Sequence, residues 1–166
     1  MDRTDEFSLM KKVRAGDTEA FRELVRPYEQ RAFSTAMAIL GSQPLAEETV
    51  QRVFVETYRT LKRKDICPFR AWLDDRIACS VLDAAGKRLR QETLTDADSA
   101  LPEHSDLLRS VMTLELPYRI VMAFRYCQQL SIPQIASLLN VDESEVRSRL
   151  YRARLKLLQG QYPLPA

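Results

Sequence analysis

Five cationic side chains are concentrated in one short stretch near the C-terminus. Arg147, Arg149, Arg152, Arg154 and Lys156 follow one another at spacings that are typical of a helix. Cations in the body of a helix can neutralise phosphates, and every phosphate contact releases counterions. The stretch therefore predicts binding to a nucleic-acid backbone. The alternative is an amphipathic surface helix whose arginines are only solvated.

Polar side chains at the start of this stretch and just before it could read bases. An arginine that binds guanine with two hydrogen bonds contributes about 1–3 kcal/mol of discrimination in the major groove. The candidates for base reading are Glu143, Ser144, Glu145, Arg147 and Ser148.

Two predicted helices position these side chains. Ser131 with Gln134, and Asp142 with Glu145, each form the sequence pattern of a capping box at the start of a helix. Asn140 lies between the two helices and tolerates the left-handed conformation that a tight turn requires. Apolar residues follow the second start at helical spacing, namely Val146, Leu150, Ala153 and Leu157. The pattern predicts a helix-turn-helix whose second helix is free to enter a major groove.

The remainder of the chain is also predicted to be helical, so the expected fold class is all-α. The chain contains only four glycines and no stretch with sustained period-two alternation. The expected helices are 7–15, from 17 or 18 to 40 with a kink at Pro27, 42–61 with one buried stripe, 69–90, two between 106 and 130 separated near Leu116–Pro117, and the helix-turn-helix pair.

The charges divide the chain into three parts. Residues 1–90 carry 17 Lys or Arg and 14 Asp or Glu, and residues 105–166 carry eight and five. Residues 91–104 contain four acids and no Lys or Arg. We therefore expect two small helical domains, at 1–90 and 106–160, joined by a flexible acidic linker at 91–105.

Other classes of function find little support in the sequence. The three cysteines, Cys67, Cys79 and Cys127, are far apart and suggest reduced thiols rather than disulfides or a metal site. The single histidine, His104, lies in the expected linker, and no glycine-rich phosphate loop is present. The N-terminus is polar and no apolar run approaches the length of a membrane helix. We expect a cytoplasmic protein that is not an enzyme, has no catalytic residues, metal site, cofactor or small-molecule substrate, and does not insert into membranes.

Four stretches carry a resemblance to a known family. They are AFRELVRPYEQRAF at 20–33, LAEETVQRVF at 45–54, FRAWL at 69–73, and LPYRIVMAFRYCQQLSIPQIASLLNVDESEVRSRLYRARLKLL from Leu116. The first three resemble region 2, and the last resembles region 4, of bacterial RNA polymerase sigma factors. The order of the two regions, with no domain between them, is similar to that of the extracytoplasmic-function sigma factors.

The resemblance implies a role for the helix expected at 42–61. In this family the corresponding helix binds the clamp of the β′ subunit, and its pattern places an acid, two apolar residues, Gln and another acid in succession. Glu48 and Gln51 match, Arg52 stands where the second acid is expected, and Val55 lies one turn further on. The alternative is that these residues form a solvated helix face.

The resemblance also implies that the 62–68 loop and the helix after it open the minus-ten element and capture a flipped base. The residues concerned are Lys62, Arg63, Lys64, Phe69, Arg70, Trp72, Cys79, Lys87, Arg88 and Arg90. A single strand needs cations along its backbone and an aromatic or apolar surface for its bases. Trp72 could serve as that surface or as a core anchor, Cys79 stands where the family has Asn, and Asp74 and Asp75 add negative charge.

Region 4 in this family reads the minus-thirty-five element and binds the β flap of the polymerase. The residues implied here are Ser144, Glu145, Arg147, Ser148, Arg149, Arg152 and Arg154. The implied partners are core RNA polymerase, promoter DNA and an anti-sigma factor. Three other functions remain open: a stand-alone helix-turn-helix regulator, a protein that mimics a sigma factor without initiating transcription, and an enzyme.

Overall fold

The computed structural model describes residues 3–92 and 106–161 of the chain, and within these ranges every regular element is a helix. The all-α prediction is confirmed. The elements are α1 (Arg3–Arg14), α2 (Thr18–Leu40), α3 (Gln43–Leu61), α4 (Phe69–Glu92), α5 (Asp106–Met112), α6 (Leu116–Met122), the π-helical turn η1 (Ala123–Cys127), α7 (Ile132–Leu139) and α8 (Glu143–Gln161). The predicted acidic linker and the C-terminal residues 162–166 lie outside the described residues.

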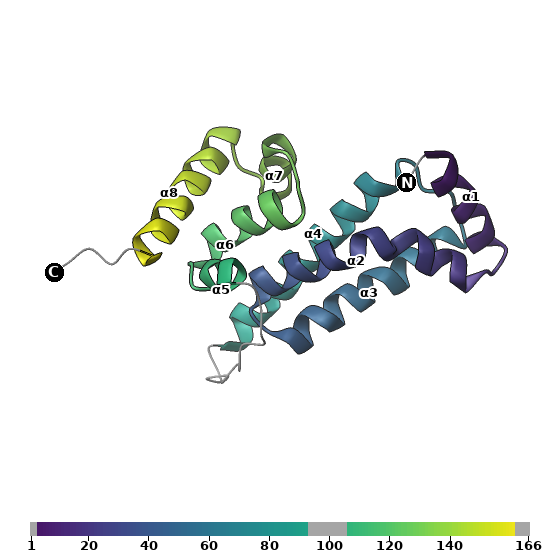
Figure 1. Cartoon of the computed structure of the whole chain (residues 1–166), viewed down its shortest axis with the longest axis horizontal. Coiled ribbons are helices and arrows are strands. Elements are labelled where there is room, and N and C mark those ends of the chain that lie inside the picture. Colours follow the sequence, from purple (N-terminus) through teal and green to yellow (C-terminus); the bar gives the residue numbers. More distant parts are fainter. Residues whose placement is uncertain (1–2, 93–105, 162–166) are drawn as a thin grey trace.

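The first four helices form a bundle in which α2, α3 and α4 run side by side (Figure 1). The side chain of Asp17 caps α2 by accepting a hydrogen bond from the Ala20 N–H at 3.1 Å. At the other end, Gly41 has a φ of +62°, and its N–H closes α2 by donating to the Met37 carbonyl. Both ends of α2 therefore lie where the sequence predicts them, and the helix continues through Pro27.

Helix α1 is longer than the sequence analysis predicted, since it begins at Arg3 rather than near Phe7. Asp5 and Glu6 lie in its first turn, where acidic side chains favour the positive end of a helix dipole. Glu6 also accepts a 3.0 Å hydrogen bond from the Tyr28 hydroxyl on α2. Burial, followed by the contact with Glu6, raises the pKa of Tyr28 to about 12.

The apolar residues of α3 do not form the one buried stripe that was predicted. The fully buried row faces α2 and α4 and consists of Ala46, Thr49, Val53, Thr57 and Leu61. The neighbouring row, Val50, Phe54 and Tyr58, is only partly buried and lies at the side of the helix. Two threonines enter the buried row because their hydroxyls donate to carbonyls of the preceding turn, those of Leu45 and Val53.

The second group of helices, α5 to α8, contains the predicted helix-turn-helix. Ser131 and Gln134 form the reciprocal capping box, and Asn140 has a φ of +54° in the turn. Val146, Leu150 and Ala153 are buried, and Leu157 packs against the core at the end of the same stripe. The predicted stripe of α8 is thus confirmed. Tyr126 on η1 is half exposed.

The two groups of helices are in contact with each other. Helices α5 and α6 and the turn η1 pack against α2, and Figure 1 shows this contact beside the C-terminal half of α2. The residues buried there include Ala36 and Ile39 on α2 and Val121 and Phe124 from the second group. The described parts of the chain therefore form one continuous core.

Candidate functional site

Helix α8 carries the five cations that the sequence concentrates near the C-terminus. Arg147 donates to the Glu143 carboxylate at 3.0 Å, and Arg149 donates to that of Glu145 at 2.8 Å. Both pairs have the acid four residues before the arginine, which is the favourable order on a helix. Glu145 thus lies beside Arg149, while Asp142 directly precedes the first residue of α8. The first half of α8 presents paired acids and arginines, a surface able both to donate and to accept hydrogen bonds.

The cations in the second half of α8 are bound to the preceding helices. Arg154 donates to the Tyr126 hydroxyl, with its Nε at 2.9 Å, and its guanidinium stacks on the same ring. Lys156 donates to the Glu115 carboxylate at 2.9 Å. Arg152 is exposed, as are Ser144 and Arg147, whereas Ser148 and Arg149 are partly buried. The predicted minus-thirty-five residues therefore share one helix, but only part of the set is exposed to an incoming ligand.

A second candidate surface lies on the outer side of α3. Glu48, Gln51, Arg52 and Val55 are all exposed there, and the Val55 side chain is 43% exposed although it is apolar. Arg52 donates to the Glu48 carboxylate at 2.7 Å. The predicted clamp residues therefore lie together, and the cation that replaces the expected acid forms an ion pair with the carboxylate of the motif.

An apolar groove between α2 and α3 extends this surface. It has a volume of about 650 Å³, and Gln51 and Val55 lie at its edge. Its apolar wall is formed by Phe21, Phe33, Val50, Phe54 and Tyr58. The rings of Phe21 and Tyr58 meet edge to face, with centroids 5.2 Å apart. The expectation of one buried stripe along 42–61 hid the groove, because Val50, Phe54 and Tyr58 share the helical spacing of that stripe but are only partly buried.

The loop between α3 and α4 and the start of α4 form a third candidate surface. Lys62, Arg63 and Lys64 are exposed in the loop, which is anchored by the buried Ile66. Phe69 is only 1% exposed and packs edge to face on Tyr28 with centroids 5.8 Å apart. The prediction that Phe69 contacts DNA is therefore wrong, because the apolar core of the bundle surrounds its ring.

Trp72 combines features of its two predicted roles, the core anchor and the surface for a base. It is partly buried against the core, and the guanidinium of Arg76 lies 5.7 Å from its ring centroid. Arg76, which the sequence analysis did not single out, therefore accompanies Trp72 at the surface, where an arginine–aromatic pair is a common platform for a base. Arg70 and Cys79 are exposed on the same helix.

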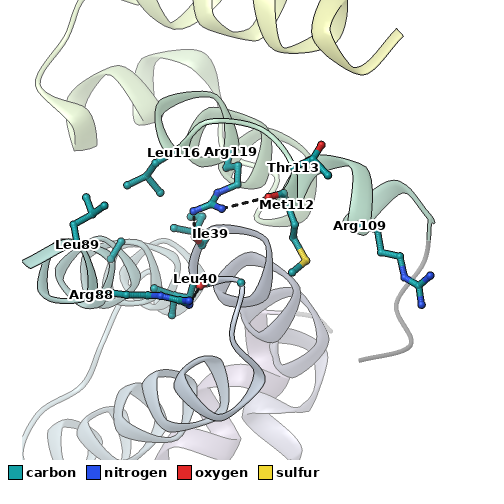
Figure 2. A pocket seen from close by; sticks show the side chains of 11 residues that line it. Ile39, Leu40, Arg88, Leu89, Arg109, Met112, Thr113, Leu116 and Arg119 are labelled. Atoms are coloured by element: carbon teal, nitrogen blue, oxygen red, sulfur yellow. Dashed lines mark hydrogen bonds between the residues drawn. The ribbon is translucent and has the colours of Figure 1, made fainter. Parts of the chain in front are cut away.

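The cations at the C-terminal end of α4 have mixed roles. Lys87 is exposed and pairs with Asp83 at 3.1 Å, and Arg90 is exposed. Arg88 is partly buried and donates to the Leu40 carbonyl at the end of α2 (Figure 2). In this arrangement the guanidinium of Arg88 satisfies a helix C-terminus, and its contact with minus-ten DNA stays a prediction.

Asp74 does not add charge to a DNA surface, contrary to the expectation from sequence. It is only 6% exposed, and its Oδ1 accepts hydrogen bonds from Arg31 at 2.7 Å and from Gln128 at 2.6 Å. Burial raises the pKa of the Asp74 carboxyl, while the charge of Arg31 and the hydrogen bond from Gln128 oppose that rise. Asp75 is exposed and lies 3.8 Å from the Arg76 guanidinium, so the pair carries little net charge.

Two other findings bear on the classes of site that the described residues can form. Within 3–92 and 106–161, no cluster of three or more His, Cys, Asp or Glu side chains could hold a metal ion. The helices in these ranges also include none with the length and apolar character needed to cross a bilayer.

Comparison with known proteins shows that the chain is similar to bacterial sigma factors. Residues 104–157 match the family model for sigma-70, region 4. The chain is 28% identical over 170 residues to the ECF RNA polymerase sigma factor SigW of Bacillus subtilis, covering 87% of this chain and 90% of that protein. It is 27% identical over 181 residues to the ECF RNA polymerase sigma-E factor of Escherichia coli K12, covering 94% of each.

A solved structure has the same fold along most of the chain. The sigma factor RpoE of Bartonella quintana, in complex with the anti-sigma factor NepR, matches with a TM-score of 0.68 and 16% identity, covering 88% of this chain and 98% of that one. The helix-turn-helix, the region 4 match and the two relatives aligned over most of their length agree with one another. Residues 104–157 of the chain therefore match region 4 of the sigma-70 family, and the chain is similar along most of its length to bacterial sigma factors of the extracytoplasmic-function type.

Proposed function

We propose that this protein is an alternative sigma factor that binds core RNA polymerase, directs promoter-specific initiation and is controlled by an anti-sigma factor. The observation that carries the proposal is the presence of two separate exposed surfaces on one chain: the polar face of α8, and the face of α3 with Glu48, Gln51 and Val55 beside an apolar groove. In this role the protein acts in the cytoplasm, where the polymerase transcribes the chromosome.

Residues 106–160 would form the module that reads the minus-thirty-five element. The N-terminal half of α8 carries Ser144, Arg147 and Ser148, the positions from which a recognition helix reaches base edges. The partly buried Arg149 and the exposed Arg152 would bind phosphates on either side. On DNA binding, Arg154 would either replace its hydrogen bond to Tyr126 with one to a phosphate, or keep it and so position the helix.

Residues 1–90 would form the module that binds the polymerase and the minus-ten element. The α3 surface offers a carboxylate, an amide and an exposed valine next to an aromatic-lined groove, which suits a partner helix with apolar and basic side chains. The basic loop at 62–64 and the Trp72–Arg76 pair would hold the displaced single strand. Each module is small and would bind DNA weakly alone, and attachment of both to one polymerase raises their effective concentration.

Control by an anti-sigma factor is supported by the Bartonella quintana neighbour, whose structure was solved in complex with one. The apolar groove on α2 and α3 is a surface that such a partner could cover in place of the polymerase.

The direct test is promoter selection in vitro. Purified protein is mixed with core polymerase and fragmented genomic DNA, and transcripts are sequenced from their 5′ ends. Start sites that depend on the protein and share elements spaced as minus-ten and minus-thirty-five sequences are expected. Specific DNA binding that is equally tight without polymerase would instead favour a stand-alone helix-turn-helix regulator.

Substitution of two different arginines of α8 should remove two different kinds of DNA contact. Arg152→Gln should weaken holoenzyme binding to all promoters alike and reduce the slope of log affinity against log salt by about 1, because one phosphate contact is removed. Arg147→Ala should relax the choice of base at one position, by about 1–3 kcal/mol. Competition binding at several salt concentrations with single-base promoter variants separates the two effects. Equal behaviour of the two variants would contradict the division of α8 into base-reading and phosphate-binding parts.

The ion pair between Arg52 and Glu48 should restrain the clamp surface. Arg52→Gln releases the Glu48 carboxylate, so affinity for core polymerase should rise a few-fold. The free energy of unfolding should fall by no more than about 0.5 kcal/mol, because an exposed pair at this spacing contributes little. Titration of labelled core polymerase and urea unfolding measure the two quantities. A fall in polymerase affinity would show that Arg52 itself contacts the polymerase.

A further inference from the structure

A half-open pocket of about 320 Å³ lies among α2, α5, α6, η1 and α8. Its apolar wall comes from α5, α6 and η1 and consists of Leu108, Val111, Met122 and Ala123. Its other lining residues carry polar atoms and are Ser34, Tyr126, Cys127 and Arg154. It shares no lining residue with the groove between α2 and α3. A pocket of this size, with an apolar wall and a few polar groups, is typical of a site for a small molecule.

The wall of the pocket favours an apolar ligand. Val111, Met122 and Ala123 are buried, and Leu108 packs against the core. The Cys127 thiol is partly buried in the same place, and burial raises its pKa, as an apolar environment does. An apolar group that enters the pocket is removed from water and gains affinity in proportion to the area buried.

The polar end of the pocket offers hydrogen-bond donors that have no acceptor. Arg154 donates to the Tyr126 hydroxyl through Nε at 2.9 Å and through a second nitrogen, and its guanidinium lies 5.6 Å from the ring centroid. Within residues 3–92 and 106–161, the remaining N–H groups of Arg154 and the O–H of Tyr126 donate to no other group. Two adjacent donors, one of them charged, favour an anion.

The other cations of α8 show that this arrangement is particular to the pocket. Arg147, Arg149 and Lys156 each form an ion pair with a carboxylate. In the described parts of the chain, Arg154 has no such partner, and no acidic residue lines the pocket. The pocket therefore combines an apolar wall with one positive charge that no described carboxylate balances.

We infer that this pocket is a binding site for a small apolar carboxylate, with its chain against the apolar wall and its head group held by Arg154 and Tyr126. The carboxylate accepts from unused N–H groups of Arg154 and from the Tyr126 O–H. The bond between the two residues is kept, because the hydroxyl oxygen accepts from Arg154 while its proton donates to the ligand. One guanidinium balances one negative charge, so a carboxylate suits the site better than a dianionic phosphate.

Three probes test the two parts of the ligand separately. Calorimetric titration of the full chain at pH 7.5 with octanoate should give a dissociation constant of about 0.1–1 mM. Hexanoate has the same head group and two fewer methylenes, and it should bind about ten-fold more weakly. Octylammonium has the same chain and the opposite charge, and it should also bind about ten-fold more weakly than octanoate, because Arg154 repels it. Equal binding of octanoate and octylammonium would overturn the site.

Four variants test the residues. Arg154→Gln should lower octanoate affinity about ten-fold, and Tyr126→Phe should lower it about three-fold, since it removes only one hydroxyl. Both change exposed side chains, so the fold should be kept. Ser34→Phe fills the pocket from α2 and should abolish binding. The matched control is Arg109→Gln, the same loss of charge at an exposed position of α5 that does not line the pocket. Equal losses in Arg154→Gln and Arg109→Gln, or full binding by a folded Ser34→Phe, would refute the inference.

The Cys127 thiol reports whether the pocket itself is occupied. Alkylation by N-ethylmaleimide, followed by peptide mass spectrometry, should slow at Cys127 when octanoate is saturating. The exposed Cys67 should keep its rate and serves as the internal reference. Octylammonium at the same concentration should protect Cys127 much less. Octanoate that binds without slowing Cys127, or that slows both thiols equally, would place its binding outside this pocket.

An occupied pocket should also withdraw Arg154 from DNA, and this consequence rests on the proposed function. Saturating octanoate should weaken promoter binding by the wild-type holoenzyme a few-fold and should have no effect on the Arg154→Gln holoenzyme. If octanoate protects Cys127 without changing promoter affinity, the pocket stands and the assignment of Arg154 to the minus-thirty-five element fails. If octanoate binds but the chain directs no polymerase-dependent transcription, the pocket stands and the proposed function fails.

Discussion

Charge reversal on α3 is expected to remove binding to core polymerase. Glu48→Lys combined with Gln51→Lys should lower the affinity by about 100-fold, equivalent to about 3 kcal/mol, because Gln51 lines the apolar groove where a partner would be anchored and Glu48 is exposed one turn before it on α3. Transcription from a selected promoter should fall to background, while the helical signal and the unfolding midpoint stay close to those of the wild type, since both side chains are exposed.

The same helix offers a matched control for this result. Glu56 is exposed on α3 but does not line the groove. Glu56→Lys changes the net charge in the same direction and should leave polymerase affinity within two-fold of the wild type. Full transcription by the double variant would reject the assignment of the α3 surface to the polymerase. Equal losses in the double variant and the control would instead reveal a general effect of charge.

Substitution of the two aromatic residues at the start of α4 is expected to have different effects, on stability for one and on promoter opening for the other. Phe69→Ala should lower the free energy of unfolding by about 3–5 kcal/mol, because it leaves a cavity in the core beneath Tyr28. Urea unfolding followed by circular dichroism measures this change, and the variant should be found largely in the insoluble fraction at 37 °C.

Trp72→Ala, in contrast, should retain the fold and lose promoter opening. Its ring is partly exposed beside Arg76, so its removal should cost less stability than removal of Phe69. Permanganate reactivity of thymines in the minus-ten element should fall at least ten-fold, while binding to core polymerase remains unchanged. Trp72→Phe is the control, since it keeps an aromatic face and should recover much of the reactivity. Normal opening by Trp72→Ala would place the base platform elsewhere.

The features that sequence reasoning predicted well depend on neighbours along the chain. The Ser131–Gln134 capping box, the left-handed Asn140 and the stripe of α8 are set by residues three or four positions apart, and all three are present. The ends of α2 at Asp17 and Gly41 are of the same kind. The short α1 prediction failed at its beginning, because its first turn contains no apolar residue to reveal the helix period.

The features that sequence reasoning missed depend on which side of a helix meets another helix. Asp74 appeared to add charge to a DNA surface, but helical spacing already placed it in register with Ile77 and Ala78, and its partners lie 43 and 54 residues away. Phe69 was assigned to DNA by its place next to a basic loop, whereas its ring packs on Tyr28 in the core. Sequence reasoning also did not show that Arg88 donates to the carbonyl of Leu40.

The sequence by itself determined the all-α fold, the helix-turn-helix and the resemblance to sigma factors, because helix periodicity, caps and motifs are local. Only the tertiary structure decided that part of the apolar row of α3 forms an open groove and that Gln128 joins Thr35 to Asp74 across the two modules. A stripe of apolar residues indicates that a helix has a buried face, but the helices that pack on it determine the width of that face. A polar residue within such a stripe finds its partner from a distant part of the chain, and no local pattern encodes that partner.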